Sequence, residues 1–363
     1  MAAALLALAC APATEGWLIT AQGRVVDLDG TGVAAAVAVS AEGALVGEVD
    51  ADSEGYWSLP IIVEEDQQVP LVVVAWDGDA VGTTWSTLEV FEQPTPSELF
   101  VGSGQRMEPA PVWMPAVTVA TPEDATLSGQ LVDGSTGEPA GQVSIALVSG
   151  WNAPADGNVV ALAASDHEGS FSAEVPAGVY TAYVRDEEGV EDAVFPASTA
   201  SLALGVVVPP LAEEELVMAL SHDGTLELDL HTTGPRAGTD GTGQPFDVYS
   251  DRQAHPDRGE PVAALIVEDP RLEVGWIYER RVSGVYRAVV FDSGGMAVVG
   301  NEDLGNSRPV VQFWSAEGPA MAQATPGRVG THWVALRLDL DRAEIQRPED
   351  YGEDANPSDP MTF

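Results

Sequence analysis

The sequence predicts an all-β chain made of tandem β-sandwich domains. Short apolar runs, either solid or alternating with a period of two, recur throughout and are bounded by Gly, Asp and Pro. The 37 glycines and 26 prolines are spread along the chain as turn residues. Only residues 211–220 and 340–345 have a helix-like spacing, and both stretches are short. The length of 363 residues indicates two or three cores, at roughly 100–200 residues per domain.

The charge of the chain excludes several classes of protein. Fifteen basic residues stand against 57 acidic ones, for a formal net charge of −42, and every basic residue is arginine. Without lysine there can be no Walker-type phosphate loop, no Schiff-base or pyridoxal enzyme and no lysine–asparagine isopeptide crosslink. A surface this acidic repels nucleic acid, and no basic stripe is present. The apolar fraction of 45% is nevertheless that of a folded chain.

Residues 1–16 have the character of an export signal. The apolar run up to Cys10 has the length of a secretory signal core and is too short to span a bilayer. Cys10 directly follows Ala7-Leu-Ala9 and is the only cysteine, so no disulfide can form within the chain. This segment resembles the lipobox of bacterial lipoproteins, which implies a lipid attached at Cys10 and anchoring in the outer membrane, on its periplasmic or cell-surface side. The alternatives are an ordinary secretory signal and a buried N-terminal helix.

Two segments of the chain repeat one pattern. Each has Gly-x-Val/Leu-x-Asp at the end of an alternating run and, further on, Asp-x-x-Gly followed by an aromatic residue. The first copy carries these features at Gly23 to Asp27 and Asp52 to Trp57, and the second at Gly129 to Asp133 and Asp166 to Phe171. The second copy is longer between its two motifs, which predicts an insertion at residues 150–158.

The repeated pattern resembles the carboxypeptidase regulatory-like, or transthyretin-like, β-sandwich over residues 17–118 and 122–220. The resemblance implies two tandem sandwiches. Glycine after aspartate supplies the positive φ of a hairpin turn, and alternate apolar residues face the core between the sheets. Residues 109–122 between the copies have the composition of a Pro-rich linker or a late strand.

The remaining residues form a different unit and a tail. Residues 225–343 contain Asp229-Leu-His231, an acidic loop at 267–272 and the strand pattern Gly284-Val-Tyr286. In this order the features resemble bacterial pre-peptidase β-sandwiches, which implies a third sandwich. Residues 344–363 hold six acids, one arginine and three prolines, and we expect them to be a disordered acidic tail.

One stretch has the beginning of a calcium loop. Asp50, Asp52 and Glu54 place oxygen donors at alternate positions before Gly55. A calcium loop needs a bidentate glutamate at its twelfth position, where this chain has Ile61. Ca²⁺ at these three residues is therefore weighed against a hairpin turn stabilised by aspartate.

Catalytic chemistry finds little support in the sequence. The five histidines are never paired with zinc-binding spacing. Asp292-Ser293-Gly-Gly295 is similar to the nucleophile motif of chymotrypsin-like proteases, but it lies between apolar runs where a hairpin turn is expected. His231 shares a strand face with Asp229 and could bond that carboxylate, although a solvated strand end is the simpler expectation.

Three tryptophans near predicted strand ends could form a sugar-stacking platform or belong to the cores, and they are Trp151, Trp276 and Trp314. We expect a non-enzymatic exported lipoprotein that acts as a structural or adhesive binding module, with no catalytic residue and no resident cofactor. Its partner would be a cell-envelope protein or glycan. A carbohydrate-binding accessory module is the alternative, and an unrecognised hydrolase a weaker one.

Overall fold

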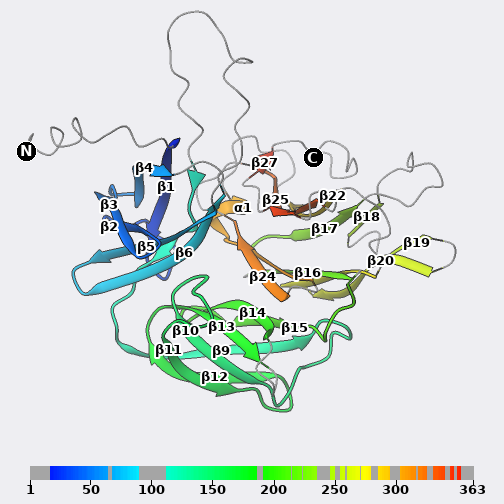
Figure 1. Cartoon of the computed structure of the whole chain (residues 1–363). Helices are drawn as coiled ribbons and strands as arrows, with labels where there is room; N and C mark the ends of the chain where they lie inside the picture. The colour runs from blue at the N-terminus through cyan, green and yellow to red at the C-terminus, as the bar shows by residue number, and fades with distance from the viewer. Residues whose placement is uncertain are drawn as a thin grey trace, which may run out of the picture.

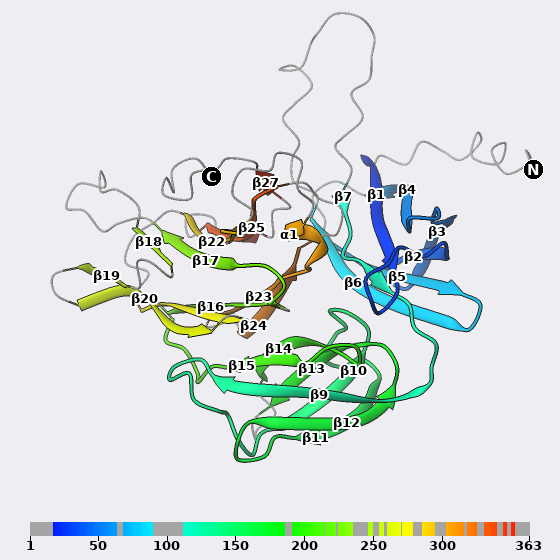
Figure 2. The same cartoon turned by 180° about the vertical axis from the view of Figure 1, so that it is seen from behind.

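The structure, a computed structural model, describes residues 17–63, 68–89, 112–185, 191–213, 215–222, 224–234, 246–249, 254–257, 260–269, 271–278, 285–294, 303–315, 318–324, 330–339, 344–346 and 350–352. The chain is all-β, as predicted (Figure 1). Within the described residues the one helix is α1 (Asp303–Asn306). The strands form three pairs of sheets, here called the first, second and third units. The second unit lies against both of the others in the two opposite views (Figures 1 and 2).

The first unit consists of two sheets that enclose one core. One sheet has the order β4 (Tyr56–Val63), β1 (Trp17–Val26), β7 (Val112–Trp113), with β8 (Val117–Thr118) also on β1. The other has the order β3 (Ala44–Asp50), β2 (Ala36–Ala41), β5 (Gln68–Asp77), β6 (Ala80–Glu89). Alternate residues of both sheets meet in the core, among them Ile19, Val37, Trp57 and Val73. The late-strand interpretation of the Pro-rich segment is therefore confirmed at β7 and β8.

The second unit repeats this topology. One sheet has the order β12 (Ser170–Pro176), β9 (Asp124–Asp133), β15 (Ala203–Val207), and the other β11 (Val159–Ala164), β10 (Ser144–Ser149), β13 (Val179–Arg185), β14 (Glu191–Ser198). In both units the first strand pairs antiparallel with the fourth and parallel with the last. The repeat visible in the sequence is thus a repeat of strand order and direction.

The repeated glycines have a packing reason. Gly23 lies opposite Trp57 in the β1–β4 register, and Gly129 lies opposite Phe171 in the β9–β12 register. A Cβ on Gly23 would lie 2.9 Å from the Trp57 ring, and one on Gly129 would lie 2.2 Å from Phe171 Cζ. The aromatic side chain therefore covers the space that a side chain on the first strand would fill. This explains why each copy has glycine at the start of its Gly-x-Val/Leu-x-Asp motif and an aromatic residue after its Asp-x-x-Gly motif.

The third unit is a larger sandwich. One sheet has the order β19 (Ala254–Asp257), β20 (Glu260–Asp269), β21 (Leu272–Ile277), β16 (Leu216–Ser221), β23 (Val310–Ser315), β24 (Gly318–Gln323). The other has the order β18 (Phe246–Val248), β17 (Leu228–Gly234), β22 (Val285–Asp292), β25 (His332–Asp339), β26 (Glu344–Gln346), with β27 (Asp350–Gly352) also on β25. The expectation of disorder from residue 344 onward is wrong at 344–346 and 350–352, because both segments add to β25 and satisfy backbone groups there. Residues 353–363 lie outside the described part.

The central strands of the first sheet of the third unit, β21, β16 and β23, are buried on both faces. On β16, Leu216, Met218 and Leu220 face the sheet β17–β22–β25, whereas Val217 and Ala219 belong to the core cluster of the second unit. All six residues of β16 are buried. A strand covered on both sides has no polar face, which is why the sequence of 211–220 lacks the alternation typical of a strand.

Among the described strands, two equivalent edge strands carry exposed leucines. β3 and β11 occupy equivalent edges of the first and second units and carry apolar side chains on the surface. Leu45 is 60% exposed on β3, and Leu162 is 79% exposed on β11. Residues 157–165, which contain β11, include no charged side chain.

Candidate functional site

The first and second units are joined through their backbones. The Trp85 amide donates to the Trp151 carbonyl at 3.0 Å, and the Trp151 amide donates to the Thr83 carbonyl at 3.0 Å. Asn152 Nδ2 also donates to the Trp85 carbonyl, at 3.3 Å. Residues 150–158 are the insertion predicted from the sequence, so the segment that distinguishes the second copy is the one that contacts the first. A Cβ on Gly150 would lie 2.2 Å from Trp85 Cζ3, so this contact needs glycine.

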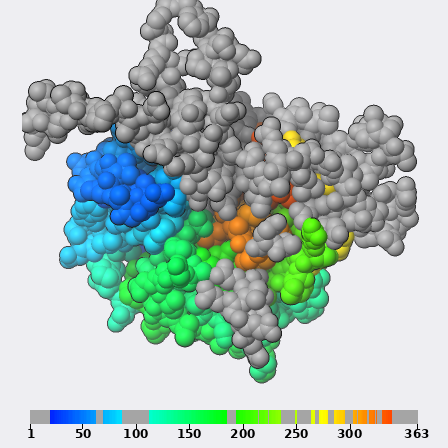
Figure 3. Space-filling model, in the orientation of Figure 1, coloured from blue at the N-terminus to red at the C-terminus, as the bar shows by residue number. Residues whose placement is uncertain are grey.

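A buried cluster then connects all three units. Trp151 and Tyr183 of the second unit pack with Val310 and Met321 of the third, and Trp85 of the first packs against them. Between the second and third units, the buried Gln312 Nε2 donates to the Val194 carbonyl at 2.8 Å. The units therefore meet through apolar packing and buried hydrogen bonds, and Figure 3 shows their surfaces meeting on one face of the molecule.

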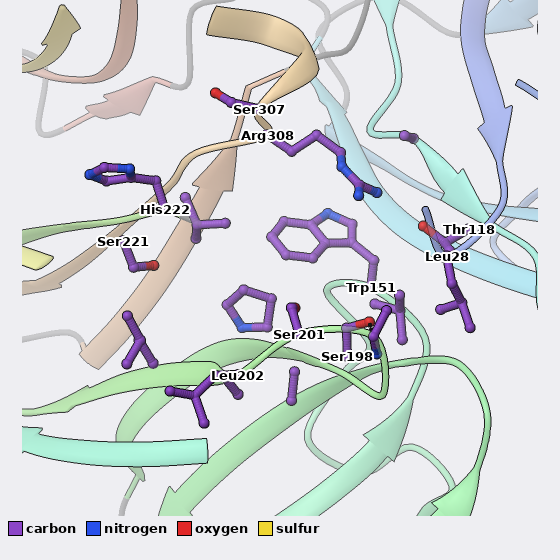
Figure 4. Close-up of a pocket in the computed structure, with 18 of the residues that line it drawn as sticks. Leu28, Thr118, Trp151, Ser198, Ser201, Leu202, Ser221, His222, Ser307 and Arg308 are labelled. Carbon is purple, nitrogen blue, oxygen red and sulfur yellow. Dashed lines mark hydrogen bonds between the residues drawn. The ribbon is translucent and has the colours of Figure 1, made fainter. Parts of the chain in front are cut away.

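At this junction lies a cleft of about 420 Å³, a size typical of small-ligand sites. Its walls come from every unit: Leu28 and Thr118 from the first, residues 196–198 and 200–204 from the second, and Ser221 and Val310 from the third. Figure 4 shows the Trp151 indole in the middle of the cleft, with Ser198 and Ser201 below it. The cleft exists only because the three units are held together.

The polar groups of the cleft are mostly hydroxyls with one guanidinium. The hydroxyls belong to Thr118, Ser198, Ser201, Ser221 and Ser307. Arg308 has a positive φ of 49° at the start of β23 and extends from the third unit towards the first (Figure 4). Its Nη2 would lie 3.5 Å from a Cβ on Gly30. Asp29 of the first unit adds one exposed carboxylate, so the cleft offers several neutral hydrogen-bond groups, one cation and one anion, a set suited to binding a polar ligand.

The histidine of the cleft is not arranged as a general base through Nδ1. The Gly224 amide donates to His222 Nδ1 at 3.2 Å. In the neutral ring this leaves the proton on Nε2, which then acts as a donor. Nδ1 of His222 is therefore not placed to activate a neighbouring serine.

A buried tyrosine supports the wall of the cleft from the second unit. Tyr180 follows the cleft residue Val179 on β13, and its hydroxyl donates to the Pro176 carbonyl. Burial raises the pKa of the Tyr180 hydroxyl above its ordinary value of 10.0, because the charged phenolate would lose hydration.

The calcium candidates form a turn. Asp52 Oδ1 accepts the Glu54 and Tyr56 amides, each at 2.9 Å, and Gly55 has a φ of 85°. The second copy repeats this arrangement, with Asp166 Oδ1 accepting the Glu168 and Ser170 amides. Among the described residues no group of three or more His, Cys, Asp or Glu is placed to hold a metal ion. The structure therefore does not bring Asp50, Asp52 and Glu54 together as ligands.

The other candidates have structural surroundings. Cys10 lies outside the described residues. Ser293 Oγ donates to the Glu227 carbonyl at 2.9 Å, as does its amide, so Ser293 closes the end of β22 against the start of β17. In the part of the chain that the structure describes, no helix is long and apolar enough to cross a membrane.

The three tryptophans do not form an exposed platform. Trp151, Trp276 and Trp314 are 5%, 7% and 3% exposed. Trp276 stacks on Tyr278 at 5.9 Å between centroids, and both Trp276 and Trp314 belong to the cluster between the second and third units. Their core interpretation is confirmed, and only Trp151 also lines the cleft.

The expectation of a solvated strand end at His231 is wrong. His231 is 3% exposed and stacks on Tyr249 with ring centroids 4.4 Å apart. Its other neighbour is Phe291, at 4.5 Å, which in turn lies 5.4 Å from His332. Strand alternation correctly placed His231 on one face with Asp229, but the sequence could not show that β22 and β25 put aromatic rings on that face.

Sequence reasoning also missed Arg308 and His222. Neither belongs to a motif, and the two residues lie 86 positions apart in the sequence. The one available signal was the scarcity of cations, since each of the 15 arginines is exceptional in a chain with 57 acids.

No family model matches the sequence, and no curated protein matches it. Solved structures that resemble part of the chain include the shaft pilin SpaA of Lactobacillus rhamnosus GG, at 10% identity and TM-score 0.19, over 53% of this chain and 98% of the pilin. A streptococcal ancillary pilin matches at 12% identity and TM-score 0.19, over 54% of this chain and 64% of its own. A B repeat of the collagen-binding surface protein of Staphylococcus aureus matches at 12% and TM-score 0.18, over 54% and 100%. At such TM-scores the resemblance is too distant to assign a function.

Proposed function

We propose that this chain is a non-enzymatic, exported structural or adhesive module that binds a cell-envelope partner in the cleft between its three units. The observation that carries the proposal is the junction itself. Main-chain hydrogen bonds from Trp151 and a shared buried cluster fix the units around an open, hydroxyl-rich cleft. A preformed cleft at a domain interface is a typical binding site. His222 as a donor and Ser293 bonded to a carbonyl favour binding over hydrolysis.

The proposed location is the outer membrane, with the chain tethered by a lipid on Cys10. The support is the lipobox-like sequence before Cys10. Intact mass and detergent partitioning of the protein from its native membrane test the tether, with Cys10→Ser as the control. A mass that begins at Cys10 plus acyl chains is the expected result. An unlipidated, water-soluble species would remove the tether and leave a secreted or periplasmic binding module.

The binding role is tested by filling the cleft. Ser201 is exposed on the cleft wall, so Ser201→Trp adds a large ring there without disturbing the core. Ser172→Trp makes the same change at an exposed position on β12, outside the cleft. We expect co-sedimentation of the purified Cys10→Ser protein with isolated cell envelopes to fall at least tenfold in Ser201→Trp and to persist in Ser172→Trp. Equal binding by both variants would move the adhesive surface away from the cleft.

A carbohydrate-binding accessory role is a second candidate, favoured by the hydroxyls that line the cleft and by the small part of Trp151, 5% of its surface, that remains exposed (Figure 4). Sugars bind through stacking on aromatic rings and through hydrogen bonds to small polar groups. A glycan screen read by tryptophan fluorescence tests it. A change that Ser201→Trp abolishes would support this candidate, and an unchanged spectrum across the screen would reject it.

A further inference from the structure

The sheet β18–β17–β22–β25 has a second face that is unlike an ordinary outer surface. Leu230, Tyr286 and Leu336 point into the core of the third unit. Because strand residues alternate, His231, Arg287 and Arg337, which follow these residues in sequence, point to the opposite face. That face carries a small apolar cluster of Val289, Phe291 and Val334, separate from the core.

One row across this face is cationic. Arg287 on β22 is the register partner of Thr233 on β17 and of Arg337 on β25. Directly opposed residues in an antiparallel pair have Cβ atoms roughly 5 Å apart. Both arginines are half-buried, and Thr233 is 3% exposed. The side chains of Thr233, Arg287 and Arg337 thus leave the sheet next to one another.

Two polar atoms of this row lack a partner. Over the described residues, neither Thr233 Oγ1 nor Arg287 Nε has a hydrogen-bond acceptor or donor within reach. A buried polar atom without a hydrogen bond costs free energy, so a native structure normally satisfies such atoms with protein, water or a ligand. The two atoms lie on neighbouring strands at the same register level, where one ligand could satisfy both.

The position of Arg287 is costly for its positive charge. Like charges directly opposed across two strands destabilise a sheet. Burial and the nearby Arg337 both lower the pKa of Arg287, which means that the site disfavours the positive charge it contains. The chain has 57 acidic residues, yet among the described residues no carboxylate contributes to the pKa of Arg287.

We propose that Thr233, Arg287 and Arg337 form a binding site for an oxyanion group, of the carboxylate, sulfate or phosphate type. Two neighbouring guanidinium groups offer parallel N–H donors that match the oxygens of such a group. The hydroxyl of Thr233 adds a third donor. The site lies on β17, β22 and β25, none of which lines the cleft. This proposal therefore does not depend on the proposed function.

The next row along the same face suits the body of a larger ligand. Tyr249 is half-buried and stacks on His231, and Val289 follows on β22 at the same level. An oxyanion carried on a ring could place its charge on the arginines and its ring beside Tyr249. Sugar acids are one source of such a group, and free inorganic anions are another.

The test exploits the composition of the chain. With 15 arginines and no lysine, selective ¹⁵N labelling of arginine gives at most one side-chain Nε–H signal for each of them. Sodium sulfate, phosphate, acetate and glucuronate are titrated at constant ionic strength against sodium chloride, and the Arg287 signal is assigned from the spectrum of Arg287→Lys. We expect the Arg287 signal to shift and saturate with at least one anion. A larger response to glucuronate than to acetate indicates a sugar acid, whereas a larger response to sulfate or phosphate indicates a tetrahedral anion.

Three variants separate a built site from general charge screening. Arg287→Lys keeps the positive charge but loses the parallel N–H donors of the guanidinium group. We expect the apparent affinity for the anion, measured from the anion-dependent rise in Tm, to fall at least tenfold. Thr233→Val removes the unsatisfied hydroxyl and should fold at least as well as the parent while weakening binding several-fold. Arg24→Gln changes an arginine that bonds the Glu54 carbonyl in the first unit, and it should leave the response unchanged. An Arg287 signal that moves no more than the Arg24 signal, or a Tm response equal in all variants, would overturn the proposal.

Discussion

Substituting alanine for Gly129 tests the packing of the repeated motif. The added methyl group would lie 2.2 Å from Phe171 Cζ and 2.3 Å from Cε1, and 2.9 Å from the Ala203 carbonyl oxygen on β15. Favourable carbon–carbon contacts lie at roughly 3.5–4.0 Å. Phe171 would therefore have to move by more than an ångström, or β9 would have to separate from β15.

The expected loss of stability follows from what Phe171 can do. It is 4% exposed and packs edge-to-face on Phe195 with centroids 6.1 Å apart, so no free space receives its ring. Overpacking a core costs about 1–3 kcal/mol. Replacing glycine by alanine within a strand would otherwise stabilise it by about 0.5–1 kcal/mol. We expect Gly129→Ala to lower the free energy of unfolding by about 1–2 kcal/mol.

Urea unfolding followed by circular dichroism measures this effect. Gly178→Ala is the matched control, because a Cβ there would lie no closer than 3.8 Å to its nearest neighbour, Tyr180 Oη, and it should change stability by less than about 0.5 kcal/mol.

A second change locates the cause. Phe171→Leu shortens the side chain that meets the new methyl group, so the double variant should be more stable than the sum of the two single effects predicts, by about 1 kcal/mol. A neutral Gly129→Ala, or strict additivity with Phe171→Leu, would refute the explanation of the motif as a glycine covered by an aromatic ring.

Four further outcomes are expected. Gln312→Ala leaves the buried Val194 carbonyl unbonded and should cost about 1–3 kcal/mol in urea unfolding, whereas a neutral result would show that this bond does not hold the second and third units together. Asp52→Ala removes two turn hydrogen bonds and should cost about 1 kcal/mol equally with and without CaCl₂. If Ca²⁺ raised the Tm of the parent but not that of Asp52→Ala, the result would support a metal site at this turn. Because burial raises the pKa of Tyr180 above 10.0, its contribution is complete below pH 10 and is lost as the pH rises through the folded-state pKa, so Tyr180→Phe should show a shallower alkaline loss of stability than the parent between pH 9 and 11.5. With a net charge of −42, the parent should gain Tm as NaCl is raised from 10 to about 150 mM, and a flat profile would mean that the acids are too far apart to repel.

The repeats were predictable because their signals are local. Asp52 and Asp166 each bond two backbone amides within four residues, and Gly55 and Gly169 adopt positive φ in the same turns. Such turn chemistry leaves its mark on consecutive residues and needs no knowledge of distant parts of the chain. The period-two runs that flank the turns then define the strands.

The junction was not predictable for the opposite reason. The sequence predicts only that Trp151 is an aromatic residue in a loop. The structure shows that its carbonyl accepts the Trp85 amide of another unit. The pairs Arg308 with Gly30, and Gln312 with Val194, likewise join residues whose sequence neighbours contain no related pattern. Contacts between units depend on the relative placement of whole sandwiches, which strand periodicity does not encode.

The third unit was only partly predictable from the sequence. Its strands were foreseen as apolar runs, but the row Thr233, Arg287, Arg337 arises from pairing between three strands that are far apart in sequence. The end of the chain was misjudged because composition favoured disorder, whereas the free edge of β25 offered hydrogen bonds to residues 344–346.

The exposed apolar edges of β3 and β11 affect how molecules of this protein associate at high concentration. Unpaired strand edges invite a neighbouring molecule to continue the sheet. Here no lysine or proline on β11 opposes that growth. Association is instead opposed by long-range electrostatic repulsion between molecules that each carry a charge of −42. Acidification towards the isoelectric point near 4.1 removes this barrier and leaves Leu162 and its neighbours free to nucleate assembly. Colloidal solubility in this protein is therefore a property of the whole surface, and pH sets the threshold at which its molecules begin to associate.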